Sequence, residues 1–535
     1  MNFGRVFARR SAVCFFMMCV LFLSCCLRLY SVATGPYADV QNRQSSLRLQ
    51  IARPRGTIYD RNMLPINNQY NKMIAAVSPT PRAIVAISSE KRESDELDGI
   101  LERLSSGKPV ICEVEKEIEC DGIVCSKIAV PHRADQPAEH IVGYIDSTGH
   151  GVTGLEEAYD DLLYSQETID AIFKTDGMGR VMEGEKIEIV GELSSIGNCI
   201  VTTLDLNIQA VAEKAALSID RGAIVIADAK TNQIRSLVSK PSYDCTRIQD
   251  FLNRSDAPLL NRTLSAYSVG SVFKPCVAAA GITAGKSNYV TQCLGKTKIT
   301  DREFRCHYST GHGRVNLAKA LAQSCNVFFY KFALHIGRES VYNMASSLGF
   351  GNTITIAEDI STAAGSITPY EELSNDAALA NMSIGQGKVS ISPISMLTLY
   401  SAIASNGSYY LPSLISATIK SGERNDEKKG SPTRVMSEDA AATLREALRG
   451  VVTDGTGKTA APTICTAAGK TATAQTGTYD KKGREITNGW FCGFFPVENP
   501  RYVVVIMEED AIGSDVSPIF AEIADGIIGL GDLCD

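Results

Sequence analysis

An uncharged apolar run near the amino terminus constrains the topology of this chain more than any other feature. Residues 11–27, SAVCFFMMCVLFLSCCL, contain no charged side chain. Three arginines precede the run: Arg5, Arg9 and Arg10. A run of this length can cross a bilayer as a helix, and arginines on one flank favour a cytoplasmic location for that flank. The pattern predicts a cytoplasmic tail over residues 1–10, a transmembrane anchor over residues 11–30, and an extracytoplasmic remainder.

A cleaved signal peptide is the alternative to an anchor. Ser31, Val32 and Ala33 form the small-x-small pattern found at cleavage sites. The apolar run is longer than a usual signal core, which favours a retained single-pass anchor in the cell membrane. Under both interpretations the chain that follows is exported.

The length of the chain requires more than one folded unit beyond the anchor. The protein has 535 residues, of which 44% are hydrophobic, so it can form two or more cores. Its net charge of -7 comes from charges scattered along the chain, without the basic stripe that binds phosphate backbones. The composition therefore argues against nucleic acid as a partner.

Residues 31–198 differ in pattern from the rest of the chain. Short strand-like segments and turns predominate, for example in the run RPRGTIYDRN at residues 53–62. Long periodic segments are few. The pattern predicts an elongated, mostly β accessory domain.

From residue 199 onwards, strands flank a helix-rich segment. A strand-like CIVTT precedes Asp205, which can cap the helix that follows. Strands are predicted at both ends of this region, at residues 223–227, 233–238, 472–476, 490–495 and 501–507. An apolar helix follows the last strand. We therefore predict one α+β domain over 199–535 whose sheet closes only when the carboxyl terminus returns to it.

The sixteen cysteines give little evidence for disulfides or for a metal site. Four lie in the apolar run, and the others lack the regular spacing of a small disulfide-rich scaffold. Cys293 and Cys306 bracket a short polar loop and are the candidate disulfide pair. Neither a Cys-x-x-Cys pair nor a His-Glu-x-x-His helix occurs, so we predict no metal site. His312 and the other five histidines are scattered, which favours loop roles.

Ser271 and Lys274 form the strongest local signal for chemistry. Pro275 lacks an N–H and would clash with the fourth residue before it, so a helix here should begin near Gly270, with Ser271 at its amino terminus. Free N–H groups at that end favour an oxyanion beside the serine. Lys274 lies one turn further along, where a desolvated neutral amine can accept the serine proton. Taken alone, the motif also fits a helix cap with a solvated lysine.

Two further motifs decide between these alternatives. Ser-Cys-Asn occupies residues 324–326, and Lys-Thr-Ala-Thr occupies residues 470–473. Together with Ser-Val-Phe-Lys at residues 271–274, their order and separation resemble the three motifs of penicillin-binding proteins and class A β-lactamases. The three motifs together are better explained by one common active site than by chance.

The chain resembles the class B penicillin-binding proteins over nearly all of its length beyond the anchor. Three further segments carry the resemblance: RPRGTIYDRN, HIVGYIDSTGHGVTGLEEAYD and SIGQGKVSISPISM. The resemblance implies a serine β-lactamase-like transpeptidase domain with an antiparallel sheet flanked by helices, preceded by an accessory pedestal domain. It also implies that no cofactor is needed and that the accessory region contacts a membrane glycan polymerase.

Four residues would carry the acylation chemistry by this resemblance. Ser271 would attack the penultimate D-alanine carbonyl of a peptidoglycan stem peptide, with Lys274 as the general base. Ser324 would relay the proton towards the leaving D-alanine. Asn326 would hold the substrate amide.

Substrate binding is expected on a strand edge. The resemblance implies that Lys470, Thr471 and Thr473 bind the terminal carboxylate and that Gly387, in the Gly-Gln-Gly block, borders the substrate. The backbone N–H groups of Ser271 and Thr473 would form the oxyanion hole. A carboxylate does require a cation and hydroxyl donors, and an extended peptide suits pairing with a strand edge.

Two positions depart from the family pattern. Ala472 replaces a glycine of the third motif, and we expect it to tune acylation or β-lactam affinity, although an inactive descendant stays open. Met63 replaces a glycine after Asp-Arg-Asn, in a structural turn. The charged residues of this first region are expected to form structural ion pairs: Arg53, Arg55, Asp60, Arg61 and Glu156.

The predicted function is that of a serine D,D-transpeptidase that is inhibited by β-lactams. A β-lactamase or D,D-carboxypeptidase is one alternative, because either would pass the acyl group to water. A non-catalytic activator of a glycan polymerase, or a β-lactam sensor, is another. Rapid loss of a penicillin adduct would favour the first alternative, and function that survives Ser271→Ala would favour the second.

Overall fold

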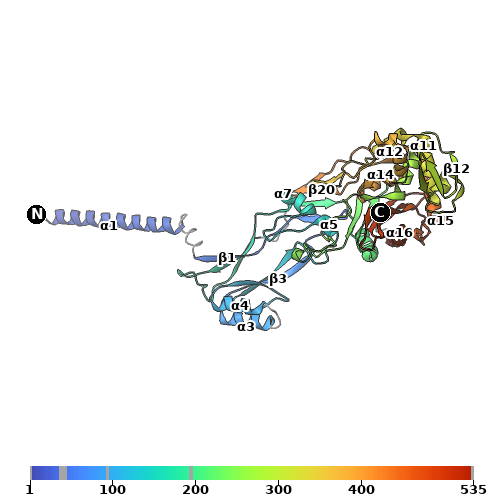
Figure 1. Cartoon of the computed structure of the whole chain (residues 1–535). Coiled ribbons are helices and arrows are strands. Elements are labelled where there is room, and N and C mark those ends of the chain that lie inside the picture. Colours follow the sequence, from blue (N-terminus) through green and yellow to red (C-terminus); the bar gives the residue numbers. More distant parts are fainter. Residues whose placement is uncertain (1–2, 35–44, 92–95, 192–196, 532–535) are drawn as a thin grey trace. The chain divides into compact units, whose positions relative to one another are not determined.

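The computed structural model describes residues 3–34, 45–91, 96–191 and 197–531 (Figure 1). The chain divides into two compact units. Unit 1 comprises Met1–Pro54, Asn71–Val130 and Ser165–Ser194, and unit 2 comprises Arg55–Tyr70, Pro131–Tyr164 and Ser195–Asp535. The predicted accessory segment 31–198 thus contributes to both units. Parts of the predicted tail and accessory segment, residues 1–2, 35–44, 92–95 and 192–196, lie outside the described residues.

Helix α1 spans Phe3–Thr34 and includes the predicted anchor (Figure 1). Within α1, the segment Phe7–Thr34 contains an 18-residue window with a mean hydropathy of 2.3 and no buried residues. Its length and composition are sufficient to cross a membrane.

Unit 1 contains two three-stranded sheets. One has the order β1 (Ser46–Ala52), β6 (Ile169–Lys174), β7 (Glu188–Val190), and the other has β4 (Val110–Val114), β3 (Tyr70–Val77), β5 (Ile123–Val130). Two helices that the sequence patterns did not predict, α3 (Pro81–Glu90) and α4 (Leu97–Ser105), bury Ile87 and Leu104 against the second sheet. Thr80 caps α3 by accepting a hydrogen bond from Ala83 N.

The five-stranded sheet of unit 2 is built from both ends of the predicted domain. Its order is β10 (Ile234–Lys240), β9 (Gly222–Asp228), β25 (Tyr502–Glu509), β24 (Glu485–Phe495), β23 (Ala468–Tyr479), and all neighbours are antiparallel. The predicted closure by the carboxyl terminus is therefore confirmed. One face, with Ile224 and Ile506, packs on α8 (Leu206–Ala215) and α16 (Gly513–Gly529), and Asp205 caps α8 as predicted.

The other face of this sheet packs on the helical segment. Its helices are α9 (Lys274–Thr283), α10 (Leu317–Ala322), α11 (Asn326–Ile336), α12 (Arg338–Ser347), α13 (Asp376–Ser383), α14 (Pro393–Ala404) and α15 (Glu438–Thr453). Every residue of α14 is buried, which makes this helix the centre of the core. The orange and yellow part of Figure 1 contains most of these helices.

Smaller sheets complete unit 2. A four-stranded sheet has the order β2 (Thr57–Tyr59), β8 (Cys199–Thr202), β20 (Ile415–Lys420), β21 (Glu423–Asp426), with β2 and β8 parallel. Two two-stranded ribbons precede α10, namely β12 (Val290–Cys293) with β15 (Gly313–Asn316) and β13 (Lys296–Ile299) with β14 (Arg302–Arg305). The remaining short pieces near the site are β11 (Tyr267–Ser268), which pairs with β18 (Ser390–Ile391), and the 3₁₀ turn η3 (Gly270–Phe273).

Candidate active site

Ser271 lies at the start of a helix, as the position of Pro275 predicts. The chain forms the 3₁₀ turn η3 from Gly270 to Phe273 and continues directly into α9, with Pro275 at its second position. Two long-range bonds hold this turn: Gly270 N donates to Gly385 O at 3.0 Å, and the Tyr400 hydroxyl donates to Val272 O at 3.1 Å. Ser271 itself is half-buried, so it stays reachable from solvent.

Gly270 allows the turn to lie against strand β23. Its φ of 57° is in the left-handed region, and an added Cβ would stand 3.0 Å from the Ala474 Cβ. The nucleophile turn and the third motif are therefore brought together by packing, although about 200 residues of chain separate them.

Lys274 is fully buried among oxygen acceptors from the second motif. Its Nζ donates to Ser324 O at 2.7 Å, to Ser324 Oγ at 3.1 Å and to Asn326 Oδ1 at 2.6 Å. The ring of Phe329 lies 5.5 Å from Nζ. Burial lowers the pKa of Lys274 to about 7, and the nearby Cys306 and Cys325 oppose this shift only in part. The amine is therefore neutral in a substantial fraction of molecules near neutral pH.

Ser324 adopts a backbone conformation that is unusual for serine. Its φ is 52°, in the left-handed region, at the junction between α10 and α11. In this conformation its carbonyl and its hydroxyl both contact the Lys274 amine. Local strain thus coincides with the polar contacts of the second motif.

Lys470 lies on β23 and is the second fully buried lysine of the site. Burial lowers its pKa well below the usual value, and the positive charge of Lys274 lowers it further. Its Nζ donates to Thr471 O at 3.0 Å. Strand β23 pairs only with β24 in the described part of the chain, so its other edge is open for an extended peptide.

The hydroxyls of the third motif are also positioned. Thr471 Oγ1 lies 2.8 Å from Thr456 Oγ1, and Thr473 Oγ1 accepts from Gly513 N at 3.1 Å. The methyl of Ala472 is buried in the core, at 4% exposure. Gly387 lies in the same loop as Gly385, whose carbonyl holds the nucleophile turn. Neither Thr456 nor Gly513 was predicted from the sequence, because neither belongs to a recognisable motif.

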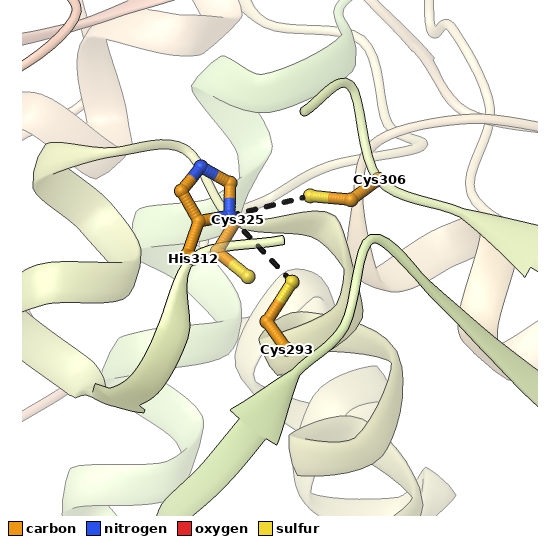
Figure 2. Close-up of side chains that lie close together, drawn as sticks. All are labelled: Cys293, Cys306, His312 and Cys325. Atoms are coloured by element: carbon orange, nitrogen blue, oxygen red, sulfur yellow. Dashed lines mark hydrogen bonds between the residues drawn. The ribbon is translucent and has the colours of Figure 1, made fainter. Parts of the chain in front are cut away.

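The candidate disulfide between Cys293 and Cys306 is not formed, and both residues are free thiols. They meet His312 and Cys325 instead, and the four donor atoms all lie within 4.8 Å of one another (Figure 2). This set was not predicted, because its spacing in the sequence, Cys-x12-Cys-x5-His-x12-Cys, contains no Cys-x-x-Cys pair. His312 lies in a loop, as predicted, but its imidazole contacts the sulfurs of Cys293 and Cys306.

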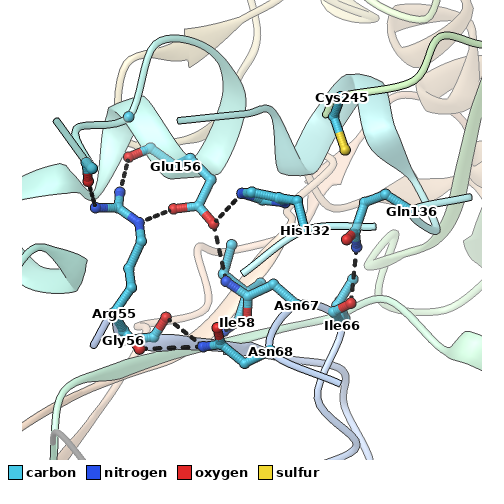
Figure 3. Close-up of polar contacts among 12 residues, drawn as sticks. Arg55, Gly56, Ile58, Ile66, Asn67, Asn68, His132, Gln136, Glu156 and Cys245 are labelled. Carbon is cyan, nitrogen blue, oxygen red and sulfur yellow. Dashed lines mark hydrogen bonds and ion pairs between the residues drawn. The ribbon is translucent and has the colours of Figure 1, made fainter. Parts of the chain in front are cut away.

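The prediction of structural ion pairs in the first region holds for Arg55 with Glu156 (Figure 3) and for Arg61, which lies 3.7 Å from Asp205. Asp60 instead accepts hydrogen bonds from backbone N–H groups. Buried Arg55 pairs with buried Glu156 and, at 2.8 Å, with Asp160. Glu156 also accepts from Asn67 Nδ2 at 2.9 Å and lies 3.1 Å from His132 Nε2. Burial acts to raise the pKa of Glu156, but the hydrogen bonds and charges of its partners outweigh burial and lower that pKa.

Comparisons with known proteins agree with this geometry. Residues 222–525 match the family described as the penicillin binding protein transpeptidase domain. The chain is 27% identical to the stage V sporulation protein D of Bacillus subtilis over 498 residues, which are 86% of this chain and 75% of that protein. It is 26% identical to the peptidoglycan D,D-transpeptidase MrdA of Acinetobacter baumannii over 395 residues, which are 67% of this chain and 57% of that protein.

Solved structures have the same fold. Penicillin binding protein 3 of Mycobacterium tuberculosis, complexed with aztreonam, superimposes with a TM-score of 0.65 at 25% identity. The superposition covers 90% of this chain and 97% of the other. The predicted combination of an N-terminal apolar helix, a further domain and a transpeptidase-like α+β domain is thereby confirmed at the level of the fold.

Proposed function

We propose that this chain, which belongs to the penicillin-binding protein transpeptidase family, is a serine D,D-transpeptidase that cross-links peptidoglycan stem peptides through an acyl-enzyme on Ser271. One observation carries the proposal. A buried lysine amine with a pKa of about 7 lies one turn after the serine, surrounded by neutral oxygens. Such an amine is suited to accept a hydroxyl proton.

The first half-reaction acylates the enzyme. Ser271 Oγ attacks the carbonyl carbon of the penultimate D-alanine and transfers its proton to Lys274 Nζ. The N–H groups of Ser271 and Thr473 hold the oxyanion that forms. The intermediate then expels the terminal D-alanine, whose amine takes a proton through Ser324, while Asn326 holds the substrate amide.

Lys470, with Thr471 and Thr473, binds the terminal carboxylate. Two buried lysines within electrostatic reach of each other are costly to protonate together. A bound carboxylate stabilises the proton on Lys470, and the repulsion between the lysines then favours the neutral form of Lys274. Substrate binding therefore helps to set the protonation state that acylation requires. Gly387 borders the substrate on the side of the nucleophile turn.

The second half-reaction passes the acyl group to an amine of a neighbouring stem peptide. The ester bond to Ser271 breaks, an amide forms, and Ser271 regains its proton. β-Lactams inhibit by acylating the same serine, and the ester that results is a long-lived analogue of the acyl-enzyme. The relative named as a D,D-transpeptidase and the aztreonam complex of the solved neighbour support this choice.

We further propose that α1 anchors the chain in the cell membrane and that unit 2 works on the extracytoplasmic side, beside a membrane glycan polymerase. Arg9 and Arg10 precede the uncharged run 11–27 within α1, which favours a cytoplasmic amino terminus.

Fluorescent penicillin tests the proposal on the full-length protein in detergent. The wild type should be labelled covalently at one site, and Ser271→Ala should lose the label. A control variant, Ser268→Ala, changes a nearby serine of β11 and should be labelled normally. Release of the adduct within minutes would instead assign a β-lactamase, and labelling of Ser271→Ala would refute the acyl-enzyme on Ser271.

A further inference from the structure

The two ribbons that precede the second motif carry an excess of positive charge. Between α9 and α11, residues 284–325 contain seven lysines or arginines but only two acidic residues, which gives a net charge of +5. The whole chain has a net charge of -7, so the rest of the chain carries -12. Cations are thus concentrated in one short segment of an acidic protein, a pattern typical of surfaces that bind anionic ligands.

These cations are accessible and mostly uncompensated. All seven are exposed: Lys286, Lys296, Lys298, Arg302, Arg305, Arg314 and Lys319. Within the described part of the chain, only Lys296 and Arg305 have a carboxylate at ion-pair distance, and both share Glu303, at 2.7 and 3.1 Å. Lys319 Nζ donates instead to two backbone carbonyls, at 3.0 and 3.2 Å. Most of the positive charge therefore faces solvent.

The strand register gathers three of the cations on one face of ribbon β13–β14. Lys296 lies opposite Arg305, and Lys298 lies opposite Glu303. Directly opposite residues share a face of a sheet, and so do residues two apart on one strand. Lys296, Lys298 and Arg305 therefore project together, and we call this group the cationic face.

The other face of the same ribbon attaches it to the helix of the second motif. Ile299 is buried, and the ring of Phe304 lies 5.2 Å from that of Tyr330 on α11. The Tyr330 hydroxyl also donates to Arg305 O at 3.3 Å. Helix α11 begins at Asn326, and β12 of the other ribbon lies beside it (Figure 1). The cationic face thus adjoins the second motif of the active site.

Protection of an exposed ribbon against aggregation does not account for this charge. Charged side chains on edge strands do prevent pairing with other chains. In the same unit, however, the edge strand β21 carries both signs, with Glu423, Arg424 and Asp426. The bias of residues 284–325 towards one sign therefore indicates a ligand of the opposite sign.

Two exposed apolar side chains in this segment bear on the kind of anion. Leu294, in the turn between the ribbons, is 69% exposed, and Tyr308, after β14, is 54% exposed. A phosphate polymer gains nothing from these side chains. The methyl groups of alanine residues in a peptide can pack against them. The combination favours an acidic peptide as the ligand.

We propose that the cationic face is a docking surface for the acidic stem peptides of uncross-linked peptidoglycan. The inference deepens the proposed function and rests on it. Under that function each uncross-linked stem ends in a carboxylate, so a glycan strand with many stems is a polyanion. One stem at a time enters the cleft at Ser271, and the carboxylates of its neighbours meet cations beside the second motif. The charge also raises the local concentration of the strand.

Binding of uncross-linked peptidoglycan strands tests the surface directly. The full-length protein in non-ionic detergent is first acylated with penicillin, which closes the cleft, and its affinity for fluorescent strands is then measured by anisotropy. The wild type should still bind, and its affinity should fall at least about fivefold when the salt concentration rises from about 0.05 to about 0.3 M.

A triple substitution and a control with the same change in charge locate the surface. The ribbon variant, Lys296→Gln with Lys298→Gln and Arg305→Gln, should bind the strands at least about tenfold more weakly. The control variant changes three exposed lysines around β21, with Lys420→Gln, Lys428→Gln and Lys429→Gln, and should bind within about twofold of the wild type. A urea midpoint for each variant verifies that it is folded.

Two results would overturn the docking surface. One is equal affinity of the ribbon variant and the control variant, and the other is loss of strand binding once the cleft is acylated. A wild type that penicillin does not acylate would instead contradict the proposed function. Strand binding can still be measured on that protein, so the two failures are distinguishable.

Competition on the wild type identifies the ligand and covers the case in which the ribbon variant does not fold. Glycan strands from which an amidase has removed the stems should not displace the fluorescent strands. Inorganic polyphosphate and phosphatidylglycerol vesicles carry negative charge without peptide, and both should compete at least about tenfold more weakly than intact strands at equal charge. Equal competition by either would assign the surface to a phosphate polymer or a lipid and overturn the assignment to stem peptides.

Discussion

Unit 2 contains two groups of buried cations with opposite surroundings. Arg55 is buried against two carboxylates, those of Glu156 and Asp160. Lys274 and Lys470 are buried more completely, yet they donate hydrogen bonds to neutral oxygens. Among the described residues, no carboxylate lies within ion-pair distance of either amine. The same unit thus buries Arg55 with its counter-charges, as it also buries Arg235 and Arg262 beside carboxylates, and it buries Lys274 and Lys470 without any.

The difference separates a structural cluster from a reactive one. A buried cation with carboxylate partners stays charged, and breaking the pair leaves an uncompensated charge. A buried lysine without such partners loses its proton more easily, and burial lowers the pKa of both lysines. We therefore expect changes in the first group to act mainly on folding and changes in the second to act mainly on chemistry.

Lys274→Met should have the largest effect. The substitution removes the base but keeps most of the side-chain volume, so acylation by fluorescent penicillin should slow by at least about a thousandfold. Urea unfolding should change far less than in a variant that breaks the Arg55 cluster, because no buried charge loses its partner. Lys214→Met, an exposed lysine on α8, is the control. A loss of less than tenfold in Lys274→Met would place the base elsewhere.

Glu156→Gln should have the opposite profile. Arg55 loses a buried counter-charge, so the free energy of unfolding should fall by about 3 kcal/mol. The acylation rate of the folded protein should stay within about twofold of the wild type, because the cluster does not contact the substrate. Glu157→Gln on the same helix, α6 (Gly154–Ala158), removes an exposed carboxylate and should leave stability nearly unchanged. Equal free energies of unfolding for Glu156→Gln and Glu157→Gln would contradict the structural role of the Arg55 ion pairs.

The pH dependence of acylation should follow the Lys274 amine. Its pKa of about 7 means that the neutral form rises from about 9% at pH 6 to about 91% at pH 8, so the rate should rise about tenfold and then level off. Burial lowers the pKa of Lys274 and thereby sets the midpoint, and Cys306 and Cys325 oppose this shift in part. A stopped-flow or quench profile measures the rate. A flat profile would mean that proton transfer to Lys274 does not limit acylation.

The free energy of unfolding should also depend on the Lys274 amine, and it should rise with pH as the acylation rate does. The unfolded lysine keeps its proton up to about pH 10, whereas the folded lysine loses it near pH 7. Between these values the unfolded state binds more protons, so the contribution of Lys274 to stability rises with pH. Lys274→Met should abolish this part of the pH dependence.

Much of the fold was predictable because its signals are local. Alternating and apolar runs predicted the strands of the main sheet, and Asp205 predicted the start of α8. Helices α3 and α4 were overlooked, because each is short and buries only two residues. The division of residues 53–62 between units could not be predicted either, since it depends on the parallel pairing of β2 with β8.

The site was predictable in its motifs but not in its surroundings. Pro275 and the spacing to Lys274 placed the nucleophile turn, yet the approach of Gly270 to Ala474 is a matter of tertiary packing. The four donors around Cys325 lack a short spacing, so only the fold reveals them. Long-range convergence of single residues leaves no periodic or local pattern in a sequence.

The smallest predicted effect concerns Met63 and Ala472, the two positions where the resemblance leads us to expect glycine. Met63, in the turn near the Arg55 cluster, has a φ of 61° and an exposed side chain, so it bears left-handed strain without compensating burial. Met63→Gly should raise the free energy of unfolding by about 1 kcal/mol. Ala472, in the catalytic strand, is extended and buried, so Ala472→Gly should lower it by about 0.5–1 kcal/mol. Urea unfolding of both variants measures the sign. A gain in stability for Ala472→Gly would show that this methyl strains the catalytic strand.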